Sequence, residues 1–409
     1  MGRYVLPAII TLVITGLILT ACGSRPSVLD QILEQNELVV ITRNGPTTYY
    51  EGPDGPTGFE YELARRFSEY IGVELSIVVP PNFTDILPLT ARGDAHLAAA
   101  GLTVTDKRKS KVRFGPVYQE ITPQLVYRSG SVRPKSLSDL DGMLEVVAGS
   151  SHEEKLLELR SEYPELVWLA NRDDDTEQLL SMISSQLIEY TVADSNELSV
   201  NRHFYPEVKP AFAISPPEQL AWAFPISTDN SLFDTATTFF NKIKANGTLE
   251  QLIERYYGHI ETFDYVGTRS YQAHVEQRLP QFRELFMEAA SKIDMDWRLL
   301  AAIGYQESHW NPDAVSPTGV RGIMMLTHAA AKDIGIKDRR DPEQSIRGGA
   351  EYLARMLRRI PERVPEPDRT WLALAAYNVG LGHLEDARIL TQKNKGDSDR
   401  WVDVKKNLP

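Results

Sequence analysis

The hydrophobic positions of this chain follow two patterns, and the change between them falls near residue 260. In the first part, short apolar runs alternate with stretches whose apolar residues recur every three or four positions. The predicted strands include 38–42, 74–79, 145–148, 190–194 and 220–224, and the predicted helices include 61–72, 179–188 and 233–257. Strands that alternate with helices predict an α/β domain with a largely parallel sheet, here over residues 36–260.

A polar, glycine-containing joint at 261–270 separates this domain from a purely helical part at 271–409. Leu279, Phe282 and Phe286 place apolar side chains on one face of a first helix. Further helical stretches are expected at 297–307, 329–334, 345–357 and 371–377. The predicted fold is therefore two-domain, with an α/β domain followed by one dominated by helices.

The first 22 residues predict an export signal, because an almost unbroken apolar run from Val5 to Leu19 follows a basic start. The end of this run, Leu19-Thr20-Ala21-Cys22, resembles the lipobox of bacterial lipoproteins. The resemblance implies lipidation of Cys22, a tether at 23–35 and, with Gly23 next, a place at the periplasmic face of the outer membrane. An uncleaved anchor or an ordinary signal peptide is the alternative.

Composition excludes several classes of function. The 409 residues carry 44 Lys and Arg against 56 Asp and Glu, a net charge of −12, which argues against a general nucleic-acid binder. The eight His are scattered singly and Cys22 is the only cysteine. We therefore expect no metal site, no disulfide within the chain and no cofactor.

Three segments of the first domain resemble the family 3 bacterial solute-binding proteins for amino acids. They are Gly58 to Leu63, Gly101 to Arg108 and Asn246 to Gly258. The resemblance implies two α/β lobes that close over a small zwitterionic ligand. In this chain that ligand would be an amino acid or a muropeptide with a regulatory role.

The same resemblance implies four ligand-binding residues. Arg108 would pair with the ligand carboxylate, and Thr103 would donate a hydrogen bond. Ser150 lies in a turn that would cradle the anion at the start of a helix, and Asp194 would take the amino group. Two alternatives stay open: Arg108 could belong to a solvated basic run, or the domain could keep this fold without a ligand.

In the helical part, one carboxylate stands at the end of an apolar helix. Leu300, Ile303 and Gly304 predict a buried face, and Glu307 follows on the last turn before Asn311-Pro312 ends the run. Partial burial favours the neutral form of a carboxyl group, which can then donate a proton to a glycosidic oxygen. Taken alone, an ordinary surface carboxylate fits the same pattern.

Three motifs follow Glu307-Ser308 in order: Ser316 to Met325, Gly349 to Leu353, and Ala375 to Gly382. Together these resemble the lysozyme-like family 1 lytic transglycosylases, over residues 279–389. The resemblance implies that the chain acts on peptidoglycan glycan strands, with Glu307 as the only catalytic carboxylate. This residue would act as acid and then as base, and the product would be a 1,6-anhydro sugar.

The resemblance also assigns the remaining site residues. It implies that Ser316 and Met324 line the cleft, that Tyr352 orients the reacting sugar, that Tyr377 packs near the acid, and that Asn378 binds the acetamido group. Met324 and Tyr352 fit a helical core equally well. Met325 stands where the family usually has Gln, so one hydrogen bond of the family is missing.

Two further readings of the chain remain. The helical domain could be a hydrolase similar to goose-type lysozyme, for which Asp313 and Glu351 stay open as a second carboxylate. Alternatively, the chain could be a solute-binding protein with an inert glycan-binding domain at its C-terminal end.

Overall fold

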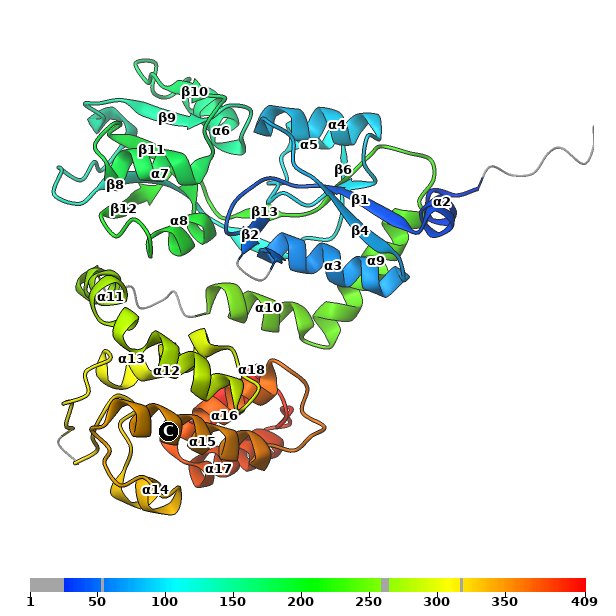
Figure 1. The fold of residues 1–409 in the computed structure, drawn as a ribbon. Helices are drawn as coiled ribbons and strands as arrows, with labels where there is room; N and C mark the ends of the chain where they lie inside the picture. The colour runs from blue at the N-terminus through cyan, green and yellow to red at the C-terminus, as the bar shows by residue number, and fades with distance from the viewer. Residues whose placement is uncertain (1–25, 53–54, 259–264, 317–318) are drawn as a thin grey trace, which may run out of the picture. The chain divides into compact units, whose positions relative to one another are not determined.

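The computed structural model describes residues 26–52, 55–258, 265–316 and 319–409. The predicted signal segment and lipobox, with Cys22, lie outside these residues, as do 261–264 of the expected joint. The chain forms two compact units, Met1–Leu249 and Glu250–Pro409 (Figure 1). Across the described helices, none combines the length and the apolar character needed to span a membrane.

The first unit has two lobes, each built on a five-stranded sheet. The sheet of the first lobe has the order β4 (Glu74–Val78), β1 (Glu37–Ile41), β5 (Leu97–Ala98), β14 (Ala223–Phe224) and β6 (Arg113–Phe114). Strand β1 runs parallel to β4 and β5, with Leu38 opposite Leu75, whereas β14 is antiparallel to β5 and β6. The chain therefore leaves this lobe after β6 and returns to it with β14.

The second lobe has the sheet order β10 (Leu169–Asn171), β9 (Leu144–Val147), β11 (Tyr190–Asp194), β8 (Pro123–Arg128) and β12 (Val208–Ala213). Here β9 is parallel to β10 and β11, and β8 is antiparallel to β11 and β12. Two short antiparallel strands, β7 (Gln119–Ile121) and β13 (Glu218–Leu220), lie where the chain passes between the lobes. Strands β2 (Tyr50–Gly52) and β3 (Gly55–Thr57) form a separate hairpin.

Helices cover the sheets of the first unit. They are α2 (Val28–Gln35), α3 (Phe59–Ile71), α4 (Ile86–Arg92), α5 (Asp106–Lys109), α6 (Ser151–Leu159), α7 (Thr176–Ser184), α8 (Ser195–Asn201) and α9 (Ser231–Ala245). The α/β class is confirmed, but both sheets are mixed, so the prediction of a largely parallel sheet was wrong. The single helix predicted over 233–257 is also wrong, because Gly247 adopts a left-handed backbone with φ of 75° and separates α9 from α10 (Thr248–Tyr257).

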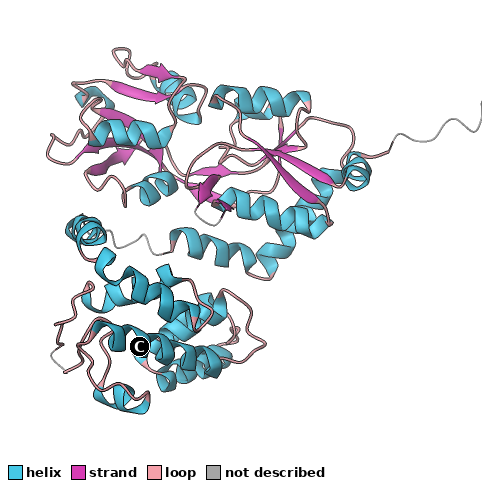
Figure 2. Ribbon diagram, in the orientation of Figure 1, coloured by secondary structure: helices cyan, strands magenta, loops and turns pink. Residues whose placement is uncertain are grey.

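The described part of the second unit contains helices and loops but no strand of a sheet (Figure 2). Its remaining α-helices are α11 (Tyr265–Gln277), α12 (Leu279–Ser291), α13 (Trp297–Ser308), α14 (His328–Asp333), α15 (Pro342–Arg359), α16 (Asp368–Val379), α17 (Leu381–Lys393) and α18 (Trp401–Val404). Helices α12, α13 and α15 enclose a core around Phe286, Leu300 and Met324. The all-helical prediction is confirmed, although α11 already begins within the expected joint.

Helix α10 belongs to the second unit by its contacts. The side-chain amide of Gln251 donates to the Asp368 carboxylate at the start of α16. Glu254 forms an ion pair with Lys405 at 2.8 Å, and Glu250 forms one with Arg400 at 3.3 Å. The compact second unit therefore begins before the joint that the sequence suggested.

Phe286 offers a test of this division. Its ring is fully buried in the core of the second unit, so Phe286→Ala should lower the stability of that unit by about 3–5 kcal/mol. We expect differential scanning calorimetry to show one transition moved to lower temperature and the other unchanged. The matched variant Phe240→Ala, which opens the core of the first unit, should move the other transition. A shift of both transitions by either variant would contradict two independent cores.

Candidate active site and solute cleft

Helix α13 carries Glu307 on its last turn, and the end of this helix is held in place. Asp296 caps its start by accepting a hydrogen bond from the backbone N–H of Arg298 at 2.9 Å. At the other end, Trp310 has a left-handed backbone with φ of 55° and is 2% exposed. Its indole N–H donates to the carbonyl of Ala301 at 2.8 Å, which ties the chain beyond the helix back onto it.

The carboxyl group of Glu307 is half-buried, and no described residue supplies it with a counter-charge. Within the described ranges, it forms neither an ion pair nor a hydrogen bond with any residue. Burial raises the pKa of Glu307 above its ordinary value, since the charged form loses hydration. The two other candidate acids differ from it: Asp313 is exposed, and Glu351 is paired with Arg358 at 3.0 Å.

Tyr377 lies close to this acid, near the end of α16. Its hydroxyl donates to the carbonyl oxygen of Met324 at 3.2 Å, and its ring meets that of Tyr352 edge to face with centroids 5.4 Å apart. Burial, and then the charge of Glu307, raise the pKa of Tyr377 well above its ordinary value. Tyr377 is therefore a proton-bearing group beside Glu307, and Tyr352 packs against its ring.

Met324 does not line the cleft with its side chain, contrary to expectation. It is 1% exposed and packs between two glycines of facing helices. A Cβ atom would lie 3.2 Å from its sulfur at Gly304 and 2.6 Å from its methyl group at Gly349. Met324 therefore supports the site from the core, and its backbone carbonyl, rather than its thioether, holds Tyr377.

Ser308 holds the loop that carries Ser316 to Met325 against the end of α13. The Ser308 hydroxyl donates to the carbonyl of Ile323 at 2.8 Å, a contact that sequence reasoning missed. Ser316 stands in the turn of this loop, where its hydroxyl accepts from the N–H of Val320 at 3.2 Å. Gly322 has φ of 83°, and a Cβ atom there would lie 1.8 Å from the carbonyl oxygen of Arg339, so only glycine fits.

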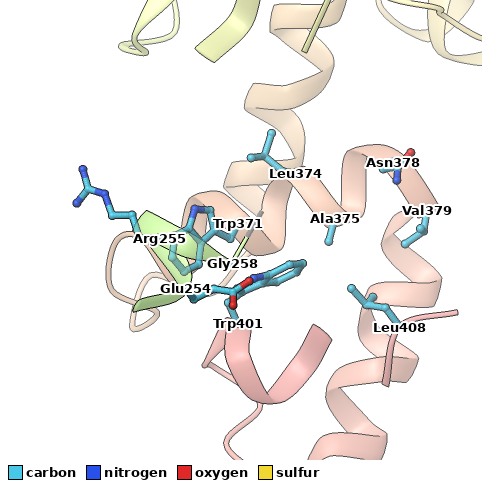
Figure 3. A pocket seen from close by; sticks show the side chains of 10 residues that line it. All are labelled: Glu254, Arg255, Gly258, Trp371, Leu374, Ala375, Asn378, Val379, Trp401 and Leu408. Carbon is cyan, nitrogen blue, oxygen red and sulfur yellow. The ribbon is translucent and has the colours of Figure 1, made fainter. Parts of the chain in front are cut away.

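Asn378 is exposed and lines a pocket beside α16. This pocket has a volume of about 460 Å³, and Figure 3 shows Asn378 and Val379 at one end of it. Its lining residues are Glu254, Arg255, Gly258, Trp371, Leu374, Ala375, Asn378, Val379, Trp401 and Leu408. An amide beside indole rings can bind an N-acetylated sugar through a hydrogen bond and apolar contact.

In the first unit, the four predicted ligand residues also come together, and all are buried. Thr103 and Arg108 come from the loop and helix after β5, whereas Ser150 and Asp194 come from the ends of β9 and β11. Arg108 is 1% exposed, so it does not belong to a solvated basic run. Ser150 caps α6 by accepting a hydrogen bond from the N–H of Glu153 at 3.2 Å.

Each of the three other ligand residues has a partner within the protein. The Arg108 Nε donates to Glu154 at 3.0 Å, and the Asp194 carboxylate lies 2.8 Å from Nε2 of His152. The hydroxyls of Thr103 and Ser151 are 3.0 Å apart. Sequence reasoning missed these α6 side chains. Their only signal was that they follow Gly149-Ser150, the turn assigned to the ligand.

Comparisons with known proteins agree with this division. Residues 38–259 match the bacterial extracellular solute-binding proteins, family 3, and residues 284–400 match the transglycosylase SLT domain. The membrane-bound lytic murein transglycosylase F of Saccharophagus degradans is 50% identical over 392 residues, which cover 95% of this chain and 78% of the relative. The protein of the same name from Hahella chejuensis is 47% identical, with coverage of 100% and 81%.

Solved structures of amino-acid-binding proteins resemble the first unit. The P235GK mutant of ArgBP from T. maritima matches with a TM-score of 0.51 and 23% identity, over 56% of this chain and 98% of that one. The cysteine-binding protein from Campylobacter jejuni matches with a TM-score of 0.53 and 16% identity, over 59% and 97%. At these identities the likeness supports the two-lobed fold.

The fold and the site define a lytic transglycosylase unit joined to a solute-binding-like unit. The identities above extend over nearly the whole chain, well beyond either domain. The chain belongs to the membrane-bound lytic murein transglycosylase F family.

The raised pKa of Glu307 predicts a pH-dependent stability. The neutral form is favoured in the folded state, so its contribution is complete below the ordinary carboxyl pKa and is lost as the pH rises through the raised value. Glu307→Gln, which is neutral at every pH, should therefore raise the unfolding temperature of the second unit at pH 7 and change it little at pH 4.

Calorimetry at both pH values provides the measurement. Glu351→Gln is the matched control, because it removes a carboxylate that is paired with Arg358, and it should not raise the transition. An unfolding temperature of Glu307→Gln at or below that of the wild type at pH 7 would argue against an unpaired, desolvated carboxyl group.

Proposed function

We propose that the second unit cleaves the β-1,4 bond between N-acetylmuramic acid and N-acetylglucosamine in peptidoglycan without consuming water, and that Glu307 is its only catalytic carboxyl group. Transglycosylation of murein is the activity that the relatives' names state. The observation that carries the residue assignment is a half-buried Glu307 whose pKa is raised by burial and which pairs with no cation among the described residues. Burial favours the protonated form of such a group, and that form can act as the acid.

The reaction uses this one group twice. Neutral Glu307 gives its proton to the bridging oxygen, the bond from that oxygen to the muramic C1 breaks, and the leaving sugar keeps the proton. The substrate's acetamido group stabilises the oxocarbenium-like C1. The Glu307 carboxylate then takes the proton of the C6 hydroxyl, whose oxygen attacks C1. This step closes the 1,6-anhydro ring and returns Glu307 to its neutral form.

The neighbouring residues position the sugar. Tyr377, fixed by its bond to the Met324 carbonyl, bears a proton beside Glu307 and does not compete with it as a base. Tyr352 stabilises the Tyr377 ring by an edge-to-face contact. Asn378, which is exposed on α16, binds an acetamido group of the substrate. Ser316 lines the cleft from the turn of its loop.

The remaining assignments concern location and regulation. The relatives are named membrane-bound, which supports attachment to a membrane, and we assign that attachment to a lipid on Cys22 at the periplasmic face of the outer membrane. The solute-binding-like unit responds to a small amino-acid or muropeptide ligand through Thr103, Arg108, Ser150 and Asp194.

A digest of purified sacculi tests the reaction. Wild-type protein should release muropeptides with 1,6-anhydromuramic ends, and mass spectrometry separates these from hydrolysis products, which are heavier by one water. Glu307→Gln should abolish release while the protein stays folded by circular dichroism, since the amide cannot give or take the proton. Reducing-end products instead of anhydro ends would overturn the transglycosylase assignment, and an undiminished rate would remove Glu307 from the mechanism.

The role of Asn378 has its own test. Loss of one hydrogen bond to the substrate costs about 1–3 kcal/mol, so Asn378→Ala should lower kcat/KM about tenfold to hundredfold on a soluble glycan fragment. Asn394→Ala, on the exposed end of α17, serves as the control and should leave kcat/KM unchanged. Equal values for both variants would exclude Asn378 from substrate binding.

A further inference from the structure

We propose that helix α6 acts as a built-in ligand of the first unit. In this proposal, the Glu154 carboxylate takes the place of a solute's carboxylate at Arg108, and the His152 imidazole takes the place of its ammonium at Asp194. The cleft is thereby closed without any solute, and a zwitterionic solute must compete with the protein's own side chains. The solute-competition part rests on the proposed ligand response, whereas closure itself does not.

The surroundings of Arg108 supply the first argument. This guanidinium carries a permanent positive charge and is buried, so it needs an anion nearby. Glu154 provides it at 3.0 Å, and the carbonyl oxygens of Gly149 and Thr103 accept from the terminal nitrogens at 3.1 and 3.4 Å. The second oxygen of Glu154 accepts from the hydroxyl of Thr105 at 3.0 Å. Arg108 therefore already has the anionic partner that a solute would bring.

Asp194 likewise already has a partner within the protein, the imidazole of His152. Its carboxylate and the His152 imidazole lie 2.8 Å apart, and both side chains are buried. Burial lowers the pKa of His152, but the charges of Asp194, Glu197 and Glu218 outweigh it and raise this pKa overall. The imidazole is thus suited to meet the aspartate as a cation.

Several of these contacts join the two lobes. Helix α6 belongs to the second lobe, whereas Arg108 and Thr105 belong to the first, so Glu154 bridges the cleft. Ser151 does the same with Thr103, and Arg43 forms a further cross-lobe ion pair with Glu197 of α8. A cavity of about 360 Å³ lies beside Arg43, lined by residues of both lobes that include Phe83 of η1 (Phe83–Asp85) and Gln178 of α7.

This arrangement defines the solute that can replace α6. Displacing Glu154 leaves a buried cation, and displacing His152 leaves a buried anion, each of which is costly unless it is paired again. A zwitterion restores both pairs at once, whereas a single-charge ion restores one. Because the solute exchanges contacts rather than adding them, its affinity is reduced by the stability of the self-closed state.

Spin-label distances in the full chain test the closure. With Cys22→Ser as background, Tyr70→Cys in the first lobe and Val167→Cys in the second provide two exposed labelling sites. Without solute, we expect a single narrow distance distribution, and Glu154→Gln should add a longer population. Glu158→Gln is the matched control on the same helix, because its carboxylate pairs only with Lys155. A wild-type distribution that is already broad, and identical to that of Glu154→Gln, would overturn the proposal.

Calorimetry tests the competition with L-leucine and L-alanine as zwitterionic probes and with acetate and methylammonium as single-charge probes. We expect Glu154→Gln to bind the amino acids at least tenfold more tightly than the wild type does, because Arg108 then lacks its anion. Unchanged or weaker binding would refute α6 as a competitor. If neither protein binds an amino acid, the ligand response proposed for this unit fails, and the spin-label result alone decides whether α6 closes the cleft.

Discussion

A half-buried carboxyl group without a cation favours its neutral form, and the second unit keeps Glu307 in that condition. Arg355 and Arg358 are paired with Glu351, and the charge that acts on Tyr377 is that of Glu307 itself. The site is held by uncharged contacts: the Trp310 indole, the Ser308 hydroxyl and the Tyr377 hydroxyl each donate to a backbone carbonyl. Rigidity is thus obtained without any group that would ionise Glu307.

The first unit offsets the cost of desolvating charged groups differently, by pairing them with groups of opposite charge. Three buried charged groups around its cleft are paired: Arg108 with Glu154, Asp194 with His152, and Arg43 with Glu197. Pairing of this kind makes a cleft that is stable when empty of solute but responsive to a competitor with the right charges. The second unit thus leaves a carboxyl group, Glu307, unpaired for the proposed chemistry. The first unit keeps its charged groups paired in a cleft that we propose responds to a ligand.

Much of this architecture followed from local pattern. The alternation of strands and helices and the apolar helical faces were enough to predict both fold types, and the order of the motifs led to the proposal of Glu307 as the acid. The side chain of Met324 was misplaced, because helical spacing alone does not distinguish a cleft wall from a core. The partners of Arg108 were missed because Glu154 lies 46 positions away and comes from the other lobe. Two further antiparallel pairings could not be predicted from local pattern. Strand β8 pairs with β11 and β12, and β14 pairs with β5 and β6, because the chain crosses from one lobe to the other and back.

The contacts of α10 separate the border of a sequence family from the border of a folded unit. The solute-binding match extends to residue 259, yet Gln251, Glu250 and Glu254 bind side chains of the second unit. Asp368, whose pKa is raised by burial, would lose one of its donors without this helix. Gene fusions that exchange the solute-binding-like half between relatives would therefore keep α10 with the surface it binds only when the crossover falls before α10, in the turn at Gly247.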